Sequence, residues 1–118
     1  MKINIVNKHK HVPQINDIYI GRGSVLGNIY THLKLNKTKV LIQVKTREEA
    51  ISKYKEWLYD ILENKQNLIK YTNIVNELNR IKVWAERENG VNLVCFCSSE
   101  NECHGGIIKK LIIDQNND

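Results

Sequence analysis

Residues 91–113 constrain the fold most, because an apolar segment, a glycine-containing turn and a second apolar segment follow one another there. Residues 91–97 are mostly apolar without clean alternation, as expected of a central strand that is covered on both faces. After a short polar loop, Cys103-His104-Gly105-Gly106 leads into residues 107–113, whose apolar side chains recur at helical spacing. The pattern predicts a buried strand, a tight turn and an amphipathic helix, with all three cysteines around the turn.

A second glycine-rich turn follows another apolar strand far upstream. Residues 17–20 alternate in hydrophobicity and lead into Gly21-Arg22-Gly23-Ser24, which Gly27-Asn28 would close. Closely spaced glycines let backbone N–H groups converge on an anion, and the Arg22 guanidinium can bind a phosphate or carboxylate through two hydrogen bonds. We therefore predict a ligand-binding loop at residues 21–28, with a purely structural turn as the alternative.

The remaining segments predict an α/β domain. Residues 2–7 fit a half-buried strand, residues 8–11 a solvated basic loop, and residues 30–33 and 40–44 a hairpin-like pair. Thr46-Arg47-Glu48-Glu49 fits the capping box, which predicts a helix from Arg47 to about Glu63. Apolar spacing predicts a second helix from Leu68 to Ala85, before a C′ glycine at Gly90. We expect one small domain over residues 1–118, with a short mixed or parallel sheet flanked by three helices.

Charge and composition narrow the class of partner. A length of 118 residues fits one domain with a modest core, and a formal charge of +5 favours anionic partners. No apolar run approaches the roughly 20 residues of a membrane-spanning helix, and no signal peptide is recognisable, so we expect a cytoplasmic protein without a membrane partner. The odd number of cysteines argues for free thiols or metal ligands rather than a disulfide framework.

The cysteine-rich turn is compatible with three chemistries. A zinc set would comprise Cys95, Cys97, Cys103 and His104, although structural zinc sites favour C-x2-C knuckles in loops over a central buried strand. Nucleophilic catalysis would use Cys103 or His104, because a thiol near a helix N-terminus has a lowered pKa. Anion binding would use the N–H groups of Gly105 and Gly106 and the positive end of the helix dipole.

The two turns also give the chain a resemblance to a known family. Tyr19-Ile20-Gly21-Arg22 continues to Gly27-Asn28, and Cys95-Phe96-Cys97 is followed by Cys103-His104-Gly105. With these motifs the chain resembles, over nearly its whole length, the domain of unknown function 4326, found in small proteins of bacteria and bacteriophages. Ile29 stands where that family typically has a proline. The resemblance implies one functional constellation that includes both turns: Gly21, Arg22, Ser24, Gly27, Asn28, Cys95, Cys97, Cys103, His104 and Gly105.

We therefore expect the two turns to bind a phosphorylated, nucleotide-like small molecule without a cofactor. Arg22 and the glycine backbones would hold phosphate, while Asn28 and His104 would hydrogen-bond the sugar or base. The full set of predicted ligand-binding residues is Gly21, Arg22, Gly23, Ser24, Gly27, Asn28, Cys97, His104, Gly105 and Gly106. In a bacteriophage, such binding would sequester a nucleotide signal of host defence.

Two alternatives stay open. The first is an enzyme that acts on a nucleotide or nucleobase through Cys103 or His104. The second is a zinc-stabilised interaction module or a nucleic-acid-binding module. Nucleic acid is the less favoured partner, because the lysines are spread along every segment and do not interleave with aromatic residues as a stacking surface requires.

Overall fold

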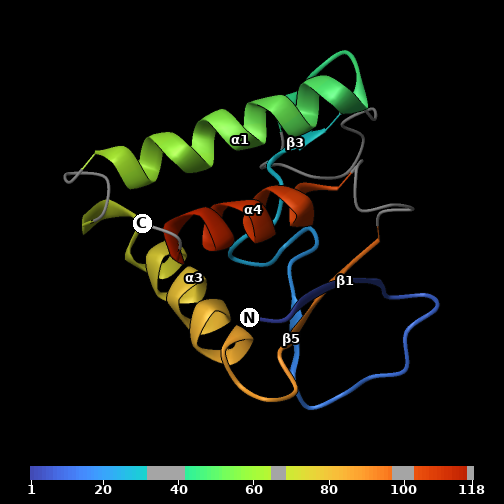
Figure 1. The fold of residues 1–118 in the computed structure, drawn as a ribbon. Helices are drawn as coiled ribbons and strands as arrows, with labels where there is room; N and C mark the ends of the chain where they lie inside the picture. The colour runs from blue at the N-terminus through green and yellow to red at the C-terminus, as the bar shows by residue number, and fades with distance from the viewer. Residues whose placement is uncertain (32–41, 65–68, 97–102, 117–118) are drawn as a thin grey trace.

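Two small parallel sheets and three helices make up the part of the fold that the structure describes (Figure 1). The structure, a computed structural model, describes residues 1–31, 42–64, 69–96 and 103–116. In chain order the elements are β1 (Ile3–Asn7), β2 (Asp17–Tyr19), β3 (Tyr30–Thr31), β4 (Ile42–Gln43), α1 (Arg47–Glu63), α3 (Thr72–Ala85), β5 (Val91–Cys95) and α4 (His104–Asn116). This arrangement confirms the predicted α/β class.

The main sheet is built around β5, as the apolar character of this segment predicts. Strands β1 and β2 flank β5 in the order β1-β5-β2, and both pair with it in parallel. All five β5 residues are buried, which fits a strand covered on both faces. Val91, Leu93 and Cys95 belong to the hydrophobic core, whereas Asn92 belongs to the opposite face.

A polar network ties the three strands together near their amino ends. The Asn92 side chain lies 3.0 Å from Asp17 Oδ1, to which it donates, and accepts a hydrogen bond from Asn4 Nδ2 at 3.2 Å. His11 Nε2 lies 2.9 Å from Asp17 Oδ1. His11 is therefore a half-buried partner of the sheet, and the prediction that it lies in a solvated loop is wrong.

The second sheet corrects the predicted hairpin. β3 and β4 do pair, with Tyr30 opposite Ile42, but they run parallel. Antiparallel strands can be joined by a tight turn, whereas parallel strands need a longer crossover, so local turn signals gave the wrong direction. The connecting residues 32–41, like Cys97 and Leu68, lie outside the described residues.

The helices stack outward from the sheet. α3 packs against β5 and α4 packs against β1, while α1 lies over α4 (Figure 1). α1 has the predicted bounds, and it begins at Arg47 because Thr46 Oγ1 accepts a hydrogen bond from the Glu49 N–H at 3.1 Å. It buries Ala50, Tyr54, Leu58 and Ile61, spaced three or four residues apart.

The other helix ends differ in part from the prediction. α3 begins at Thr72 and ends at Ala85, so Gly90 lies too far beyond the helix to be its C′ residue. Gly90 instead has a φ of 69° and approaches Lys2 closely, where a Cβ atom would come within 2.5 Å of the Lys2 carbonyl oxygen. Among the described residues, no helix combines the length and apolar character needed to cross a bilayer.

Candidate functional site

The two predicted turns meet at the carboxyl end of β2. His104, the first residue of α4, directs its Nε2 atom to the carbonyl oxygen of Ile20, 2.5 Å away. The next residue, Gly105, packs against the same isoleucine, where an added Cβ would lie 3.0 Å from Ile20 Cδ1. Residues 84 positions apart are therefore joined directly, and the loop at residues 21–28 begins at this junction.

His104 is buried and neutral, and it links α4 to Ile20 rather than presenting an exposed base. Its side chain is only 7% exposed, and the Tyr54 ring packs edge-on against it at 5.2 Å between centroids. Burial lowers the pKa of His104, and the nearby charge of Arg22 adds to this, although the bond to Ile20 and the neighbouring Cys95 act in the opposite direction. Because a carbonyl oxygen accepts only, Nε2 carries the proton and Nδ1 is left as an acceptor.

Two thiols lie beside this histidine in the core. Cys95 Sγ and Cys103 Sγ are 3.2 Å apart, and both residues are at most 2% exposed. Cys103 Sγ lies 3.9 Å from His104 Nδ1 and accepts a hydrogen bond from the Gly105 N–H at 3.3 Å. The Gly106 N–H donates to the Cys103 carbonyl oxygen at 3.1 Å. These two N–H groups are thus bonded within the turn rather than directed at a ligand.

The structure brings together only some of the four predicted zinc ligands. Zinc–sulfur bonds of roughly 2.3 Å in a tetrahedron place two sulfurs about 3.8 Å apart, which is longer than the Cys95–Cys103 separation of 3.2 Å. Within the described ranges, no group of three or more Cys, His, Asp or Glu residues is arranged to hold a metal ion. Cys97, the remaining member of the set, lies outside these ranges.

The glycine-rich loop is closed by its own hydrogen bonds. The Ser24 N–H and hydroxyl both donate to the Gly21 carbonyl oxygen, and the Gly27 N–H donates to that of Ser24. The Asn28 side-chain amide donates to the Ala50 carbonyl oxygen at 3.2 Å and accepts from the Tyr30 N–H at 2.8 Å. Ser24 and Asn28 therefore hold the loop in shape and fasten it to the start of α1.

Arg22 and Gly23 form the outer part of this loop. The Arg22 side chain is exposed and donates from Nη1 to the Asn28 carbonyl oxygen at 3.2 Å, which fixes its direction. In the part of the chain that the structure describes, no carboxylate forms an ion pair with Arg22. Gly23 has a φ of 88° and no described atom within 4 Å of an added Cβ. An anion can therefore approach the loop here.

A group of cationic and aromatic side chains that no local sequence pattern predicted lies beside Arg22. Its members, here called the carboxyl-edge cluster, are Lys8, His9, Tyr19 and Phe96, which lie at the carboxyl ends of β1, β2 and β5. Phe96 is 49% exposed, and its ring lies 6.1 Å from that of Tyr19 and 5.0 Å from that of His9. Lys8 Nζ lies above both the Tyr19 and the Phe96 rings, at 5.1 and 5.4 Å.

The carboxyl-edge cluster and the glycine-rich loop form one continuous surface. The Tyr19 hydroxyl donates a hydrogen bond to the Arg22 carbonyl oxygen at 3.1 Å. Gly21 is required at this contact, because an added Cβ would lie 2.3 Å from the Tyr19 hydroxyl oxygen. In parallel α/β sheets, ligands bind outside the carboxyl ends of the strands, which is where this surface lies.

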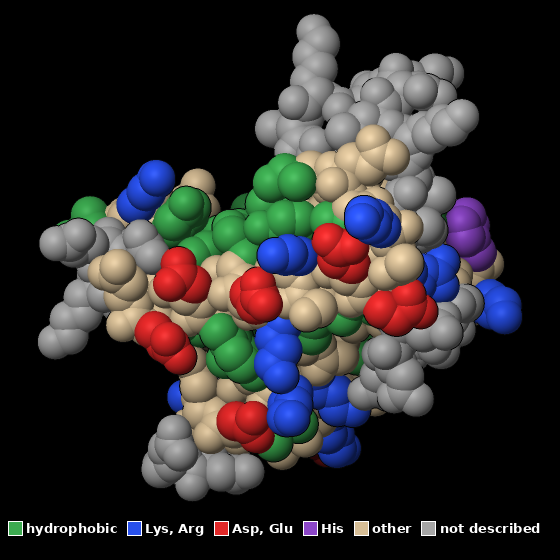
Figure 2. Space-filling view, turned by 90° about the horizontal axis from the view of Figure 1, so that it is seen from above, with side chains coloured by type: hydrophobic (Ala, Val, Ile, Leu, Met, Phe, Trp, Pro, Cys, Tyr) green, Lys and Arg blue, Asp and Glu red, His purple; other side chains and the backbone are tan. Residues whose placement is uncertain are grey.

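Charges of both signs mix elsewhere on the molecule. On the face shown in Figure 2, Lys and Arg side chains lie among Asp and Glu side chains. A surface that follows a nucleic-acid backbone would instead carry a continuous positive stripe. This face therefore offers no support for the nucleic-acid alternative.

Comparisons with known proteins place the chain in a family. No curated protein and no solved structure matches it. A family model described as a domain of unknown function (DUF4326) matches residues 3–114, which is nearly the whole chain and includes both turns. The protein therefore belongs to the DUF4326 family.

Proposed function

We propose that the protein binds a phosphorylated, nucleotide-like small molecule on the surface formed by the carboxyl-edge cluster and the glycine-rich loop. One observation carries the proposal: exposed aromatic rings lie side by side with two cations, Lys8 and Arg22, at the carboxyl ends of all three strands of the main sheet. Neither cation forms an ion pair among the residues that the structure describes. A nucleotide combines a flat π-system with a phosphate. This surface offers a partner for each.

The rings of Tyr19 and Phe96 are suited to the base. They are 37% and 49% exposed, and they stand edge to face, so a base can stack on one ring and contact the edge of the other. Base–aromatic stacking contributes about 1–3 kcal/mol per base. Lys8 already lies over both rings, and its flexible side chain can follow the phosphate once a base takes its place.

The phosphate would lie against Arg22 and the open backbone at Gly23. A guanidinium can bind two phosphate oxygens at once, and its hydrogen bond to the Asn28 carbonyl orients it beforehand. Asn28 and His104 support the loop from behind, since their side chains bond to protein groups. The proposal therefore assigns them to positioning rather than to direct contact with sugar or base.

Two substitutions test this assignment. Titration calorimetry with adenosine and guanosine mono-, di- and triphosphates should show binding that Arg22→Ala weakens at least tenfold, because a charge-assisted bond of about 1.5–3 kcal/mol is lost. Phe96→Leu, which keeps an apolar side chain without a ring, should weaken binding about fivefold or more.

Lys53→Ala is the matched control, because it removes one positive charge from an exposed position on α1. Its affinity should equal that of the unchanged protein. If Arg22→Ala and Phe96→Leu also bind with unchanged affinity while remaining folded, the ligand does not bind on this surface.

A second candidate function, an enzyme acting through Cys103, has one observation in its favour. The Gly105 N–H donates to Cys103 Sγ at the start of α4, an arrangement that stabilises a thiolate. Recovering the nucleotide after incubation and denaturation separates the two functions. Unchanged ligand supports binding, and with it sequestration of the kind a bacteriophage would use against a nucleotide signal. New products that disappear in Cys103→Ser would support the enzyme.

A further inference from the structure

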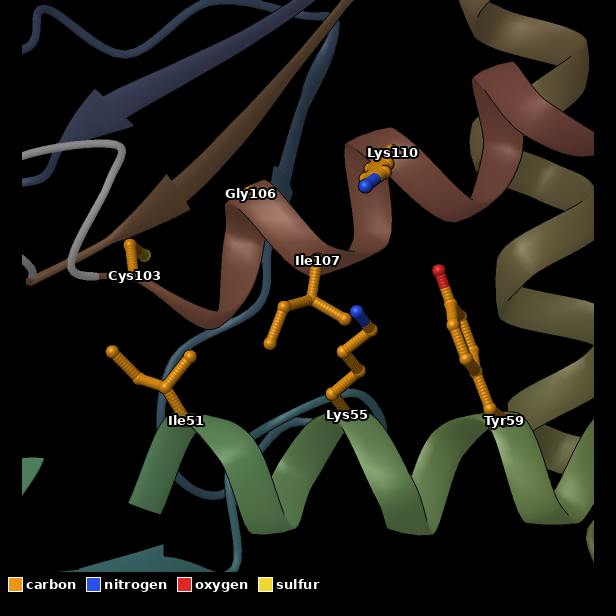
Figure 3. Close-up of a pocket in the computed structure, with 7 residues that line it drawn as sticks. All are labelled: Ile51, Lys55, Tyr59, Cys103, Gly106, Ile107 and Lys110. Carbon is orange, nitrogen blue, oxygen red and sulfur yellow. The ribbon is translucent and has the colours of Figure 1, made fainter. Parts of the chain in front are cut away.

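A groove of about 250 Å³ separates α1 from α4 (Figure 3). Ile51, Lys55 and Tyr59 lie one helical turn apart on α1 and rise toward α4, while Ile107 points back toward α1. Cys103 lies at one end of the groove, and Lys110 adds a second ammonium group from α4. The proposed nucleotide contacts use none of these side chains.

The two lysines of the groove, Lys55 and Lys110, form no ion pair with the carboxylates that the structure describes. Lys55 Nζ instead lies 5.7 Å from the centroid of the Tyr59 ring. Both lysines line the same hollow, so an anion bound there would be attracted by two positive charges.

The rest of the lining is apolar and sets the direction of a bound molecule. Ile51 and Ile107 cover the end near Cys103, and the Tyr59 ring forms a flat wall near the other end. Burial and the negative charge of Asp114 raise the pKa of Tyr59, so this hydroxyl stays neutral. Asp114 itself disfavours an anion beyond Tyr59. An anionic group therefore fits best at the lysines, with an apolar body toward Ile51.

We propose that the groove between α1 and α4 is a second binding site, for a small organic anion with a carboxylate or phosphate head and a short apolar or aromatic body. Its volume of 250 Å³ lies just below the roughly 300–1,000 Å³ of typical ligand pockets, so the ligand is smaller than a nucleotide. Gly106 lets the body approach the α4 backbone closely, because it has no side chain.

Phenyl phosphate serves as a probe, because it joins a dianionic head to one aromatic ring. In a ¹⁵N-labelled sample, its addition should shift the amide signals of Gly106, Ile107 and Lys110.

Lys55→Gln and Lys110→Gln should each weaken binding about tenfold, since each removes one charge-assisted contact. Lys53→Gln, which makes the same change on α1 outside the groove lining, should leave the affinity unchanged. Phenol and inorganic phosphate, which each lack one half of the probe, should bind more weakly.

Three outcomes would overturn the proposal: equal affinity in Lys55→Gln and Lys53→Gln, phenol binding as tightly as phenyl phosphate, or signal shifts confined to the loop at residues 21–28. The site is independent of the proposed nucleotide function. Arg22→Ala should therefore retain phenyl phosphate binding in the groove, whether or not nucleotides bind at the other surface.

Discussion

At the scale of single residues, His104 joins the two glycine-containing turns. Its bond to the Ile20 carbonyl is buried, so His104→Ala leaves a carbonyl oxygen without its partner and opens a space under Tyr54. We expect a loss of about 1–3 kcal/mol in the free energy of unfolding, measured by urea denaturation. His9→Ala, which removes an exposed histidine, should change it by less than about 0.5 kcal/mol. Equal stability of both variants would contradict the linking role of His104.

At the scale of the loop at residues 21–28, Gly23 and Gly27 require glycine for different physical reasons. An added Cβ at Gly27 would lie 2.5 Å from the Gly21 carbonyl oxygen, whereas Gly23 has open space and is constrained only by its φ of 88°. Gly23→Ala should therefore lower the free energy of unfolding by about 1–2 kcal/mol, the cost of a left-handed residue. Gly27→Ala should lower it further, because backbone atoms must move. Chemical unfolding of both variants checks the order, and a less damaging Gly27→Ala would refute it.

At the scale of the whole molecule, two titrating groups make the fold sensitive to acid in separate pH ranges. In the folded protein the pKa of His104 lies below its ordinary value of 6.5. As the pH drops below about 6.5, the unfolded chain therefore binds a proton before the folded protein does, and the free energy of unfolding falls. Burial alone would raise the pKa of Asp17, but hydrogen bonds from Gln14, Asn92 and His11 lower it below 3.8 overall. A second loss of stability should therefore follow below about pH 3.8.

Urea denaturation at a series of pH values measures both losses. Asp17→Asn should reduce the loss of stability below about pH 3.8. It should leave the loss of stability that begins near pH 6.5 unchanged, because Asp17 and His104 lie at opposite ends of the sheet. A pH profile of Asp17→Asn that matches the original protein throughout would show that this carboxylate does not stabilise the fold.

Local patterns predicted the parts of the molecule that local contacts determine. The capping box at Thr46 gave the bounds of α1, and the apolar run from Val91 gave the central strand. The meeting of the two turns was expected only from the family resemblance, which implied one constellation that includes both. By contrast, the direction of β4 relative to β3 depends on a crossover that no local periodicity encodes.

The carboxyl-edge cluster could not be predicted in the same way. Lys8, Tyr19 and Phe96 come from three separate segments, and only the pairing of β1 and β2 with β5 brings them together. In the sequence Phe96 reads as part of a buried strand, yet it is exposed because β5 ends at Cys95. The groove between α1 and α4 depends likewise on how two distant helices pack.

The strand order β1-β5-β2 also has a consequence for how the chain folds as it is synthesised. β1 and β2 both pair with a strand that begins at Val91, so neither has its partner when it leaves the ribosome. Contacts that span so much of the sequence must overcome a large loop-closure entropy, and such topologies fold slowly. Until β5 emerges, two strand edges stay unpaired and open to association with other chains.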